Sequence, residues 1–260
     1  MTTHEDWRKR SRDYLNRVCA EAPKHASEWK LFEALDCAVA PYRPIHAVPD
    51  DGISEYNRRL AAAKGGMHGS PFLIDIGIEG FLHKEEALKL YEMAYYASGD
   101  ILELGTHKGL STSILVQALH DRGNGEIVTI DINKATNKVA MANLARSPGA
   151  KRVNFMLTDA KAGMDKLTAE GRIFAFVFVD HWHGYEATYD AALRVYGLLS
   201  AGRHVMFHDF FDPSNADPEH VYGVYQAVID VFGTDPRFIF AGAAGSSALF
   251  VKATRAQLIR

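Results

Sequence analysis

The feature that most constrains the fold is a regular alternation of short apolar segments and amphipathic segments from residue 84 onward. One apolar segment, Ile173–Val179, contains no polar residue, which is typical of a strand buried on both faces of a sheet. A chain that alternates strands with helices favours a parallel sheet covered by helices on both faces. The sequence therefore predicts an α/β, Rossmann-like, doubly wound fold.

The order of the segments also predicts how the sheet ends. The expected strands are residues 100–104, 126–131, 152–157, 174–180, 203–209, 237–241 and 247–252. The expected helices are residues 84–97, 109–121, 134–146, 160–169, 184–199 and 218–232. Only residues 242–246 separate the last two strands, which is too short a segment for a crossover helix. We therefore expect an antiparallel hairpin at the end of a mostly parallel, seven-stranded sheet.

The N-terminal part of the chain has a different pattern. Apolar residues recur at helical spacing over residues 5–40, with a break at Pro23, and a further helix is expected at residues 54–64. Residues 65–71 contain three glycines and a proline and are typical of a flexible connection. We therefore expect two parts: an N-terminal helical extension or lid at residues 1–70, and a ligand-binding domain at residues 71–260.

The composition argues against several classes of protein. Of the 260 residues, 47% are hydrophobic, which is enough for one sizeable core. The net charge of -3 indicates neither nucleic-acid binding nor membrane binding. Cys19 and Cys37 do not have the spacing of a metal site. Because no segment is typical of a signal peptide or a membrane span, the chain is expected to be cytoplasmic. The sequence leaves a homo-oligomer open.

A glycine-containing turn follows the first expected strand. In sheets of this kind, ligands bind beyond the carboxyl ends of the strands. Gly105 permits a tight turn and a close approach of the backbone to a ligand, and Gly109 allows close packing at the start of the next helix. Ser111 can satisfy a free N–H group there, while the carboxylate of Glu103 is suited to a ligand ammonium group. The alternative is an ordinary strand-to-helix turn that happens to contain glycine.

The spacing of these glycines bears on the ligand. The segment does not follow the pattern G-x-G-x-x-G, so it lacks the fingerprint of a dinucleotide site. We therefore expect an adenosyl ligand without phosphate groups.

The next two strands each end at an aspartate. Asp131 is placed to accept hydrogen bonds from both hydroxyls of a ribose, or alternatively to cap the following helix. Asp159 is placed to accept a hydrogen bond from an adenine amino group, or to cap the helix that begins at Ala160. Both assignments are left open at this point.

Two further strand ends carry acidic residues and histidines. Asp180 and Asp209 follow neighbouring strands and together provide oxygen ligands for a divalent cation such as magnesium. His183 or His208 is suited to act as a general base, because imidazole titrates near neutral pH. The alternative is that these aspartates cap helices and these histidines fill space.

These motifs resemble one known family. The segment Glu103–Thr112 (ELGTHKGLST), Asp131, the segment Val179–Glu186 (VDHWHGYE) and the pair His208-Asp209 resemble class I S-adenosylmethionine-dependent methyltransferases. The branch that they resemble is the small-molecule O-methyltransferase-like group, methyltransferase 24-like. The resemblance covers about residues 72–253 and implies a seven-stranded sheet with an antiparallel last strand. It also implies that the acceptor is a small molecule.

The resemblance implies roles for individual residues. The expected cofactor-binding residues are Glu103, Gly105, Thr106, Gly109, Ser111, Asp131, Asp159, Asp180 and His181. The expected catalytic residues are His183 and Asp180. The expected metal ligands are Asp180, Asp209 and His208, with Mg²⁺ as the ion. In metal-dependent relatives the third ligand is often an acidic or amide residue beside the second aspartate, whereas here the neighbours are His208 and Phe210.

The expected reaction is methyl transfer from S-adenosylmethionine to an oxygen of a small molecule. His183 would remove the hydroxyl proton, or a metal would lower the pKa of the acceptor. Two alternatives remain. A nicotinamide-dependent oxidoreductase is disfavoured by the glycine spacing, and a non-catalytic adenosyl-binding module is disfavoured by the intact polar strand ends.

Overall fold

The computed structural model of the chain describes residues 42, 44–46, 66–70, 73–217, 219–233 and 235–259. The helices expected at residues 5–40 and 54–64 lie outside these residues, so the division of the chain at residue 70 stays a prediction. Within the described part, no helix has the combination of length and apolar character that crossing a bilayer requires.

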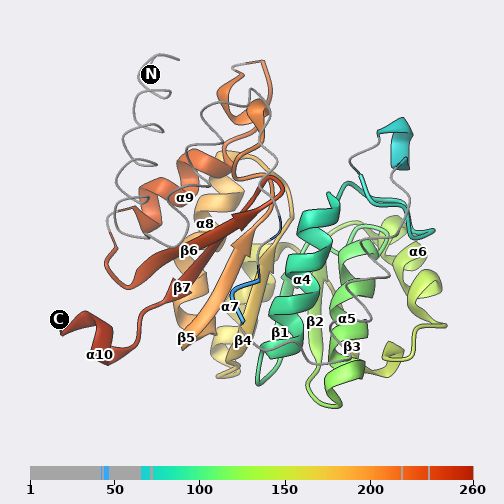
Figure 1. Cartoon of the computed structure of the whole chain (residues 1–260), viewed down its shortest axis with the longest axis horizontal. Helices are drawn as coiled ribbons and strands as arrows, with labels where there is room; N and C mark the ends of the chain where they lie inside the picture. Colours follow the sequence, from blue (N-terminus) through green and yellow to red (C-terminus); the bar gives the residue numbers. More distant parts are fainter. Residues whose placement is uncertain are drawn as a thin grey trace.

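The seven strands form one sheet in the order β3-β2-β1-β4-β5-β7-β6. The strands are β1 (Ile101–Leu104), β2 (Ile127–Asp131), β3 (Val153–Leu157), β4 (Phe174–Val179), β5 (Leu199–Phe207), β6 (Phe238–Ala244) and β7 (Ser247–Lys252). The first five pair in parallel, whereas β7 lies between β5 and β6 and pairs antiparallel with both. The expected fold and the antiparallel terminal hairpin are confirmed (Figure 1).

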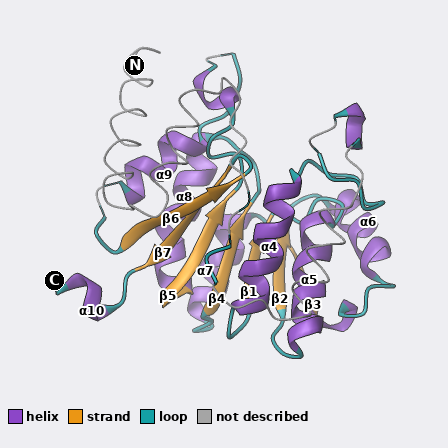
Figure 2. Ribbon diagram, in the orientation of Figure 1, coloured by secondary structure: helices purple, strands orange, loops and turns teal. Residues whose placement is uncertain are grey.

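Helices cover both faces of the sheet (Figure 2). One face carries α4 (Lys84–Tyr96), α5 (Leu110–Arg122) and α6 (Lys134–Leu144), and the other carries α7 (Ala160–Ala169), α8 (Tyr185–Leu198) and α9 (Val224–Phe232). Each face has its own hydrophobic core, with fully buried Phe176 and Phe178 on the first and Val177 and Phe207 on the second. A strand such as β4, which contributes to both cores, has to be apolar at every position.

Most boundaries agree with the expected ones to within a few residues, with three exceptions. Strand β5 begins at Leu199 instead of residue 203, where its pairing with β4 contains a register shift. Helix α9 begins at Val224 instead of residue 218, because Gly223, with φ −155°, precedes its first turn. Strand β6 continues to Ala244 instead of residue 241, because a bulge at Gly242, with φ 148°, lets the pairing with β7 continue beyond it.

The chain order places the ligand-binding edge of the sheet. From β1 the chain moves outward through β2 and β3, and it then returns to place β4 on the other side of β1. The boundary between β1 and β4 is therefore the topological switch point, where doubly wound sheets bind their ligands.

Candidate active site

A cavity of about 700 Å³ lies at the carboxyl ends of β1, β2, β4 and β5. The residues expected at the site that line it are Gly105, Thr106, Ser111, Asp131, Asp159, Asp180, His181, His183, His208 and Asp209. Glu103 and Gly109 do not line it. The structure therefore brings most of the sequence-predicted residues into one place, and what each of them binds stays a prediction.

The turn after β1 lies directly against the end of β4. Gly105 has φ 98°, and a Cβ atom at this position would be 2.0 Å from the carbonyl oxygen of Asp180. No residue other than glycine fits this conformation and this contact. Gly109 has φ 89° and precedes α5, where a Cβ atom would be 3.3 Å from Ala140 on α6. Gly109 thus permits the close packing of two helices, whereas Gly105 shapes the floor of the cavity.

Glu103 lies beneath the turn and is fully buried. Its carboxylate accepts hydrogen bonds of 2.6 Å from the hydroxyls of Ser111, Thr112 and Thr129. Burial raises the pKa of Glu103 to about 7, although the three hydroxyl donors oppose the shift. In this arrangement Glu103 holds the turn to β2 and α5, and its contact with a ligand ammonium group stays a prediction.

The two aspartates at the ends of β2 and the third strand bond to the backbone and also face the cavity. Asp131 accepts hydrogen bonds from the backbone N–H groups of His107 and Asn133, both at 2.7 Å. Asp159 accepts a 3.1 Å bond from the N–H of Ala162 and so caps α7. A carboxylate oxygen accepts more than one hydrogen bond, so capping and ligand binding are compatible.

Apolar and neutral groups line the same end of the cavity. Ile132 and Trp182 are 73% and 67% exposed, although both are large hydrophobic residues. The Nε2 atom of His181 is buried and has no hydrogen-bond partner among the described residues. Burial lowers the pKa of His181 to about 4, so the imidazole is neutral at pH 7. This wall is suited to a flat, uncharged ring with polar edges.

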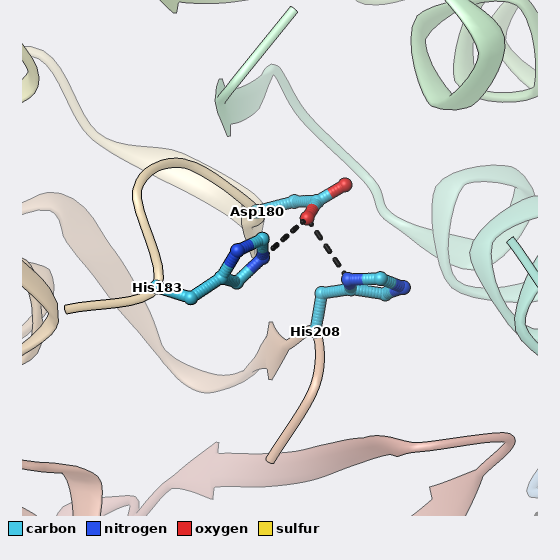
Figure 3. Close-up of side chains that lie close together, drawn as sticks. All are labelled: Asp180, His183 and His208. Atoms are coloured by element: carbon cyan, nitrogen blue, oxygen red, sulfur yellow. Dashed lines mark hydrogen bonds and ion pairs between the residues drawn. The ribbon is translucent and has the colours of Figure 1, made fainter. Parts of the chain in front are cut away.

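Three side chains converge where β4 and β5 end (Figure 3). The Oδ1 atom of Asp180 lies 3.3 Å from Nε2 of His183 and 2.9 Å from Nδ1 of His208. One ligand atom from each of the three residues lies within 4.8 Å of the other two. Asp180 and His208, which were expected to share a metal with Asp209, converge here with His183, and the role of Asp209 as a metal ligand stays a prediction.

Asp209 is held at the edge of this cluster in a left-handed backbone conformation, with φ 53°. Its Oδ1 atom accepts a 2.9 Å hydrogen bond from Ser246 Oγ, and its Oδ2 atom accepts a 3.3 Å bond from the hydroxyl of Tyr222. The carboxylate also lies 3.5 Å from His183 Nε2 and 3.3 Å from His208 Nδ1. Both oxygens of Asp209 therefore already have protein partners.

A buried glutamate that sequence reasoning missed supports the cluster from the opposite side. Glu86 on α4 is fully buried, and its Oε2 atom lies 3.3 Å from His208 Nε2. The Oε1 atom is within 2.8–3.0 Å of the Ser246 N–H, the Ser246 hydroxyl and the Ser247 hydroxyl. The only local feature of Glu86 is a capping box at the start of α4, in which the backbone N–H of His83 donates a 2.8 Å hydrogen bond to Glu86 Oε2. A capping box does not reveal contacts with residues far along the chain.

The charges of the cluster stabilise one another. Burial alone would raise the pKa of Asp180, but the His208 and His183 imidazoles outweigh burial and lower it to about 2. Burial alone would lower the pKa of His208, but Asp180, Asp209 and Glu86 outweigh it and raise this pKa well above its usual value. Burial likewise opposes ionisation of Glu86, yet His208 and His83 hold its pKa well below the usual range.

The residues present fit a divalent cation. His208 Nδ1 is buried, and it makes no hydrogen bond to any described residue despite its proximity to two carboxylates. An imidazole nitrogen without a hydrogen-bond partner, beside a carboxylate and a second imidazole, is the donor set of a metal site.

Comparisons with known proteins agree with this arrangement. Residues 102–210 match the model of a protein family described as a methyltransferase domain. The caffeoyl-CoA O-methyltransferase of Stellaria longipes is 24% identical over 150 residues, which are 54% of this chain and 61% of that protein. The chain therefore matches less than two thirds of the length of this curated relative.

Two solved structures share the fold. The O-methyltransferase TomG of Streptomyces achromogenes, in complex with S-adenosylmethionine, has a TM-score of 0.55 and 20% identity, covering 81% of this chain and 93% of its own. The O-methyltransferase of Bacillus cereus, in complex with S-adenosylhomocysteine, has a TM-score of 0.54 and 15% identity, covering 88% and 97%. The resemblance expected from the motifs is confirmed. Residues 102–210 of this chain are similar to a methyltransferase domain, and the chain shares the fold of these solved O-methyltransferases.

Proposed function

We propose that this chain transfers the methyl group of S-adenosylmethionine to an oxygen atom of a small molecule. The observation that carries the proposal is that one cavity contains both the Gly105 turn and the Asp180–His183–His208 cluster. The turn packs directly against the backbone of Asp180, whose side chain belongs to the cluster, because a Cβ atom on Gly105 would reach the Asp180 carbonyl oxygen. A cofactor that lies on the turn therefore presents its methyl group beside the cluster.

The lining of the cavity supports one orientation of the cofactor. Ile132 and Trp182 provide the exposed apolar surface on which an adenine ring would stack, with Asp159 at the polar edge of that ring. Asp131 has acceptor capacity left for the ribose hydroxyls. The methionine part then lies along Gly105, Thr106 and Ser111, with the sulfonium towards Asp180.

The size of the cavity supports a small acceptor. Pockets for small molecules have volumes of about 300–1,000 Å³, and this cavity of about 700 Å³ has to hold both the cofactor and the acceptor. The acceptor side is lined by His83, His183 and Tyr222, and a hydroxyl group placed there is within reach of the cluster. The plant and bacterial relatives are O-methyltransferases, and O-methylation is consistent with this placement.

The chemistry assigned to the protein is positioning and deprotonation. The side chain of His183 is 27% exposed, compared with 5% for His208, so His183 is the histidine that an acceptor can reach. In a site without a cation, His183 Nε2 accepts the hydroxyl proton, and Asp180 stabilises the resulting imidazolium. The acceptor oxygen then attacks the methyl carbon as the carbon–sulfur bond breaks, and the electron pair goes to sulfur. A divalent cation, when bound by the cluster, would lower the pKa of the hydroxyl.

Binding of S-adenosylhomocysteine is expected to stabilise the protein against heat, and Asp131→Ala is expected to remove most of that effect. A ligand at 100 times its Kd adds about 2.7 kcal/mol to the free energy of unfolding. Without the Asp131 carboxylate, the ribose hydroxyls lose their acceptor. The measurement is the melting temperature with and without S-adenosylhomocysteine.

The control for this experiment is Asp165→Ala, because Asp165 is a surface aspartate that pairs with Arg194 outside the cavity. The control should retain the full stabilisation. An undiminished effect in Asp131→Ala would refute the ribose assignment. Stabilisation by NADPH instead of S-adenosylhomocysteine would favour an oxidoreductase over a methyltransferase.

His183→Ala is expected to lower the rate of methyl transfer by about 10²–10⁴-fold, the range typical of a lost general base. The assay follows transfer of a labelled methyl group from S-adenosylmethionine into the small-molecule fraction of a cell extract. Stabilisation by S-adenosylhomocysteine should be unchanged in this variant. The control is His120→Ala, which removes an exposed histidine from α5. Full activity of His183→Ala would exclude a role for this side chain in deprotonation.

A further inference from the structure

We propose that Asp180, His183 and His208 form a two-histidine, one-carboxylate site that selects a divalent transition-metal ion over magnesium, with Glu86 fixing the ring of His208. The inference concerns the same site as the proposed function and makes His183 a metal ligand instead of a free base. The two roles belong to two states of the site, because both use the lone pair of Nε2: His183 acts as a base only in a site without a cation, and it is a ligand when the cation is bound. Metal binding is measurable without turnover, so the inference and the proposed function can fail separately.

The donor atoms determine the class of metal. Magnesium prefers oxygen ligands and retains several waters, whereas imidazole nitrogen suits Zn²⁺, Co²⁺, Ni²⁺ and Fe²⁺. Of the three converging atoms, two are imidazole nitrogens, from His183 and His208, and one is a carboxylate oxygen, from Asp180. Asp209 is not one of the three converging donors, although its carboxylate lies 3.3 Å from His208 Nδ1 and 3.5 Å from His183 Nε2.

Glu86 determines which nitrogen of His208 faces the cluster. A carboxylate only accepts hydrogen bonds, so its 3.3 Å contact requires a proton on His208 Nε2. Nδ1 is then the His208 atom that faces the cluster, 2.9 Å from Asp180 Oδ1, and it would present its lone pair to a cation that replaces its proton. Metal-binding histidines almost always donate their other N–H in this way.

Glu86 is itself held rigidly. Its Oε1 atom is fixed by Ser246, in the turn before β7, and by Ser247, the first residue of β7. A Cβ atom on Gly245 would lie 2.4 Å from Glu86 Cγ. The ring of His183 has a comparable support, because it stacks on Tyr222 with the ring centroids 5.0 Å apart and the planes at 12°. Both histidines are therefore held in place before any ion binds, which is the property that a metal site needs.

The test is calorimetric titration of chelator-treated full-length protein with Co²⁺, Zn²⁺, Mn²⁺ and Mg²⁺, with the visible absorption of bound Co²⁺ as a second readout. We expect one Co²⁺ site whose Kd is lower than that for Mg²⁺ by on the order of 100-fold. His208→Asp replaces a nitrogen ligand with an oxygen ligand, so it should reduce the ratio of the Mg²⁺ Kd to the Co²⁺ Kd at least about tenfold. His183→Ala should abolish the visible absorption of bound Co²⁺. S-adenosylhomocysteine should still stabilise both variants.

Glu86→Gln tests the supporting role, and Glu85→Gln on the same turn of α4 is its matched control. Loss of a supporting carboxylate typically weakens metal binding by about 10–100-fold, so Glu86→Gln should weaken Co²⁺ binding by this factor and change its absorption spectrum. Glu85→Gln should change neither. Binding of Mg²⁺ as tightly as Co²⁺, no binding of any ion, or Co²⁺ binding that survives His183→Ala would each overturn the inference. The last outcome would leave His183 as the general base of the proposed function.

Discussion

Gly105→Ala is expected to abolish binding of S-adenosylhomocysteine and to lower the free energy of unfolding by about 2–5 kcal/mol. The lower part of this range comes from the left-handed backbone, because φ is 98° at this residue. The rest comes from the clash of a Cβ atom with the Asp180 carbonyl group, which is backbone and cannot rotate away. Relief of the clash requires that the turn after β1 separates from the end of β4, and the cavity floor is then lost.

The measurements for Gly105→Ala are urea unfolding and titration with S-adenosylhomocysteine. Gly123→Ala is the matched control, because Gly123 also has a positive φ, 86°, but its Cβ position faces open space. The control should lose only about 1–2 kcal/mol of stability and should bind the ligand normally. Affinity within a few-fold of wild type in Gly105→Ala would contradict the placement of the cofactor on this turn.

Glu103→Ala is expected to destabilise the fold by about 3–5 kcal/mol, because it leaves three buried hydroxyl donors without their acceptor. Glu103→Gln retains an acceptor oxygen and should lose less. Urea unfolding measures both, with the surface variant Glu170→Ala as the control. A loss below 1 kcal/mol in Glu103→Ala would show that the hydroxyls of Ser111, Thr112 and Thr129 find other partners.

The difference in stability between wild type and Glu103→Gln depends on pH, and its direction follows from the pKa of Glu103. Burial raises the pKa of Glu103 to about 7 in the folded protein, from a reference value of 4.5. The folded state therefore binds this proton more tightly, so the stability contributed by the protonated group is lost as the pH rises from 4.5 through 7. Relative to wild type, Glu103→Gln should become more stable between pH 5 and pH 8, by up to about 3 kcal/mol. A constant difference across this range would contradict the raised pKa.

The fold could be predicted from local patterns because each pattern records burial directly. The apolar run of β4 reflects two cores that meet at one strand, and the short segment at residues 242–246 left no room for a crossover. The same logic placed Asp131, Asp159, Asp180 and His208 at one edge of the sheet, since the carboxyl ends of parallel strands share an edge.

The parts that could not be predicted depend on contacts between distant segments. Glu86 lies 122 residues before His208 and 160 residues before Ser246, and no periodicity links residues so far apart. The burial of Glu103 beneath the turn has the same origin, because Thr129 on the neighbouring strand completes its set of donors. The position of Asp209 at the edge of the cluster depends on Tyr222 and Ser246, which follow Asp209 in irregular segments.

The position of β7 between β5 and β6 has a consequence for the order in which this protein matures on the ribosome. Ser246 holds both Glu86 and Asp209, and Ser247 at the start of β7 also holds Glu86, so these serines are synthesised after β1 to β5. A nascent chain whose Gly105 turn, β4 and β5 have already left the ribosome still lacks the serine donors that hold the carboxylates of Glu86 and Asp209. The residues of the glycine turn are therefore synthesised before the β6–β7 hairpin, whereas the supports of the histidine cluster are complete only when this hairpin joins the sheet.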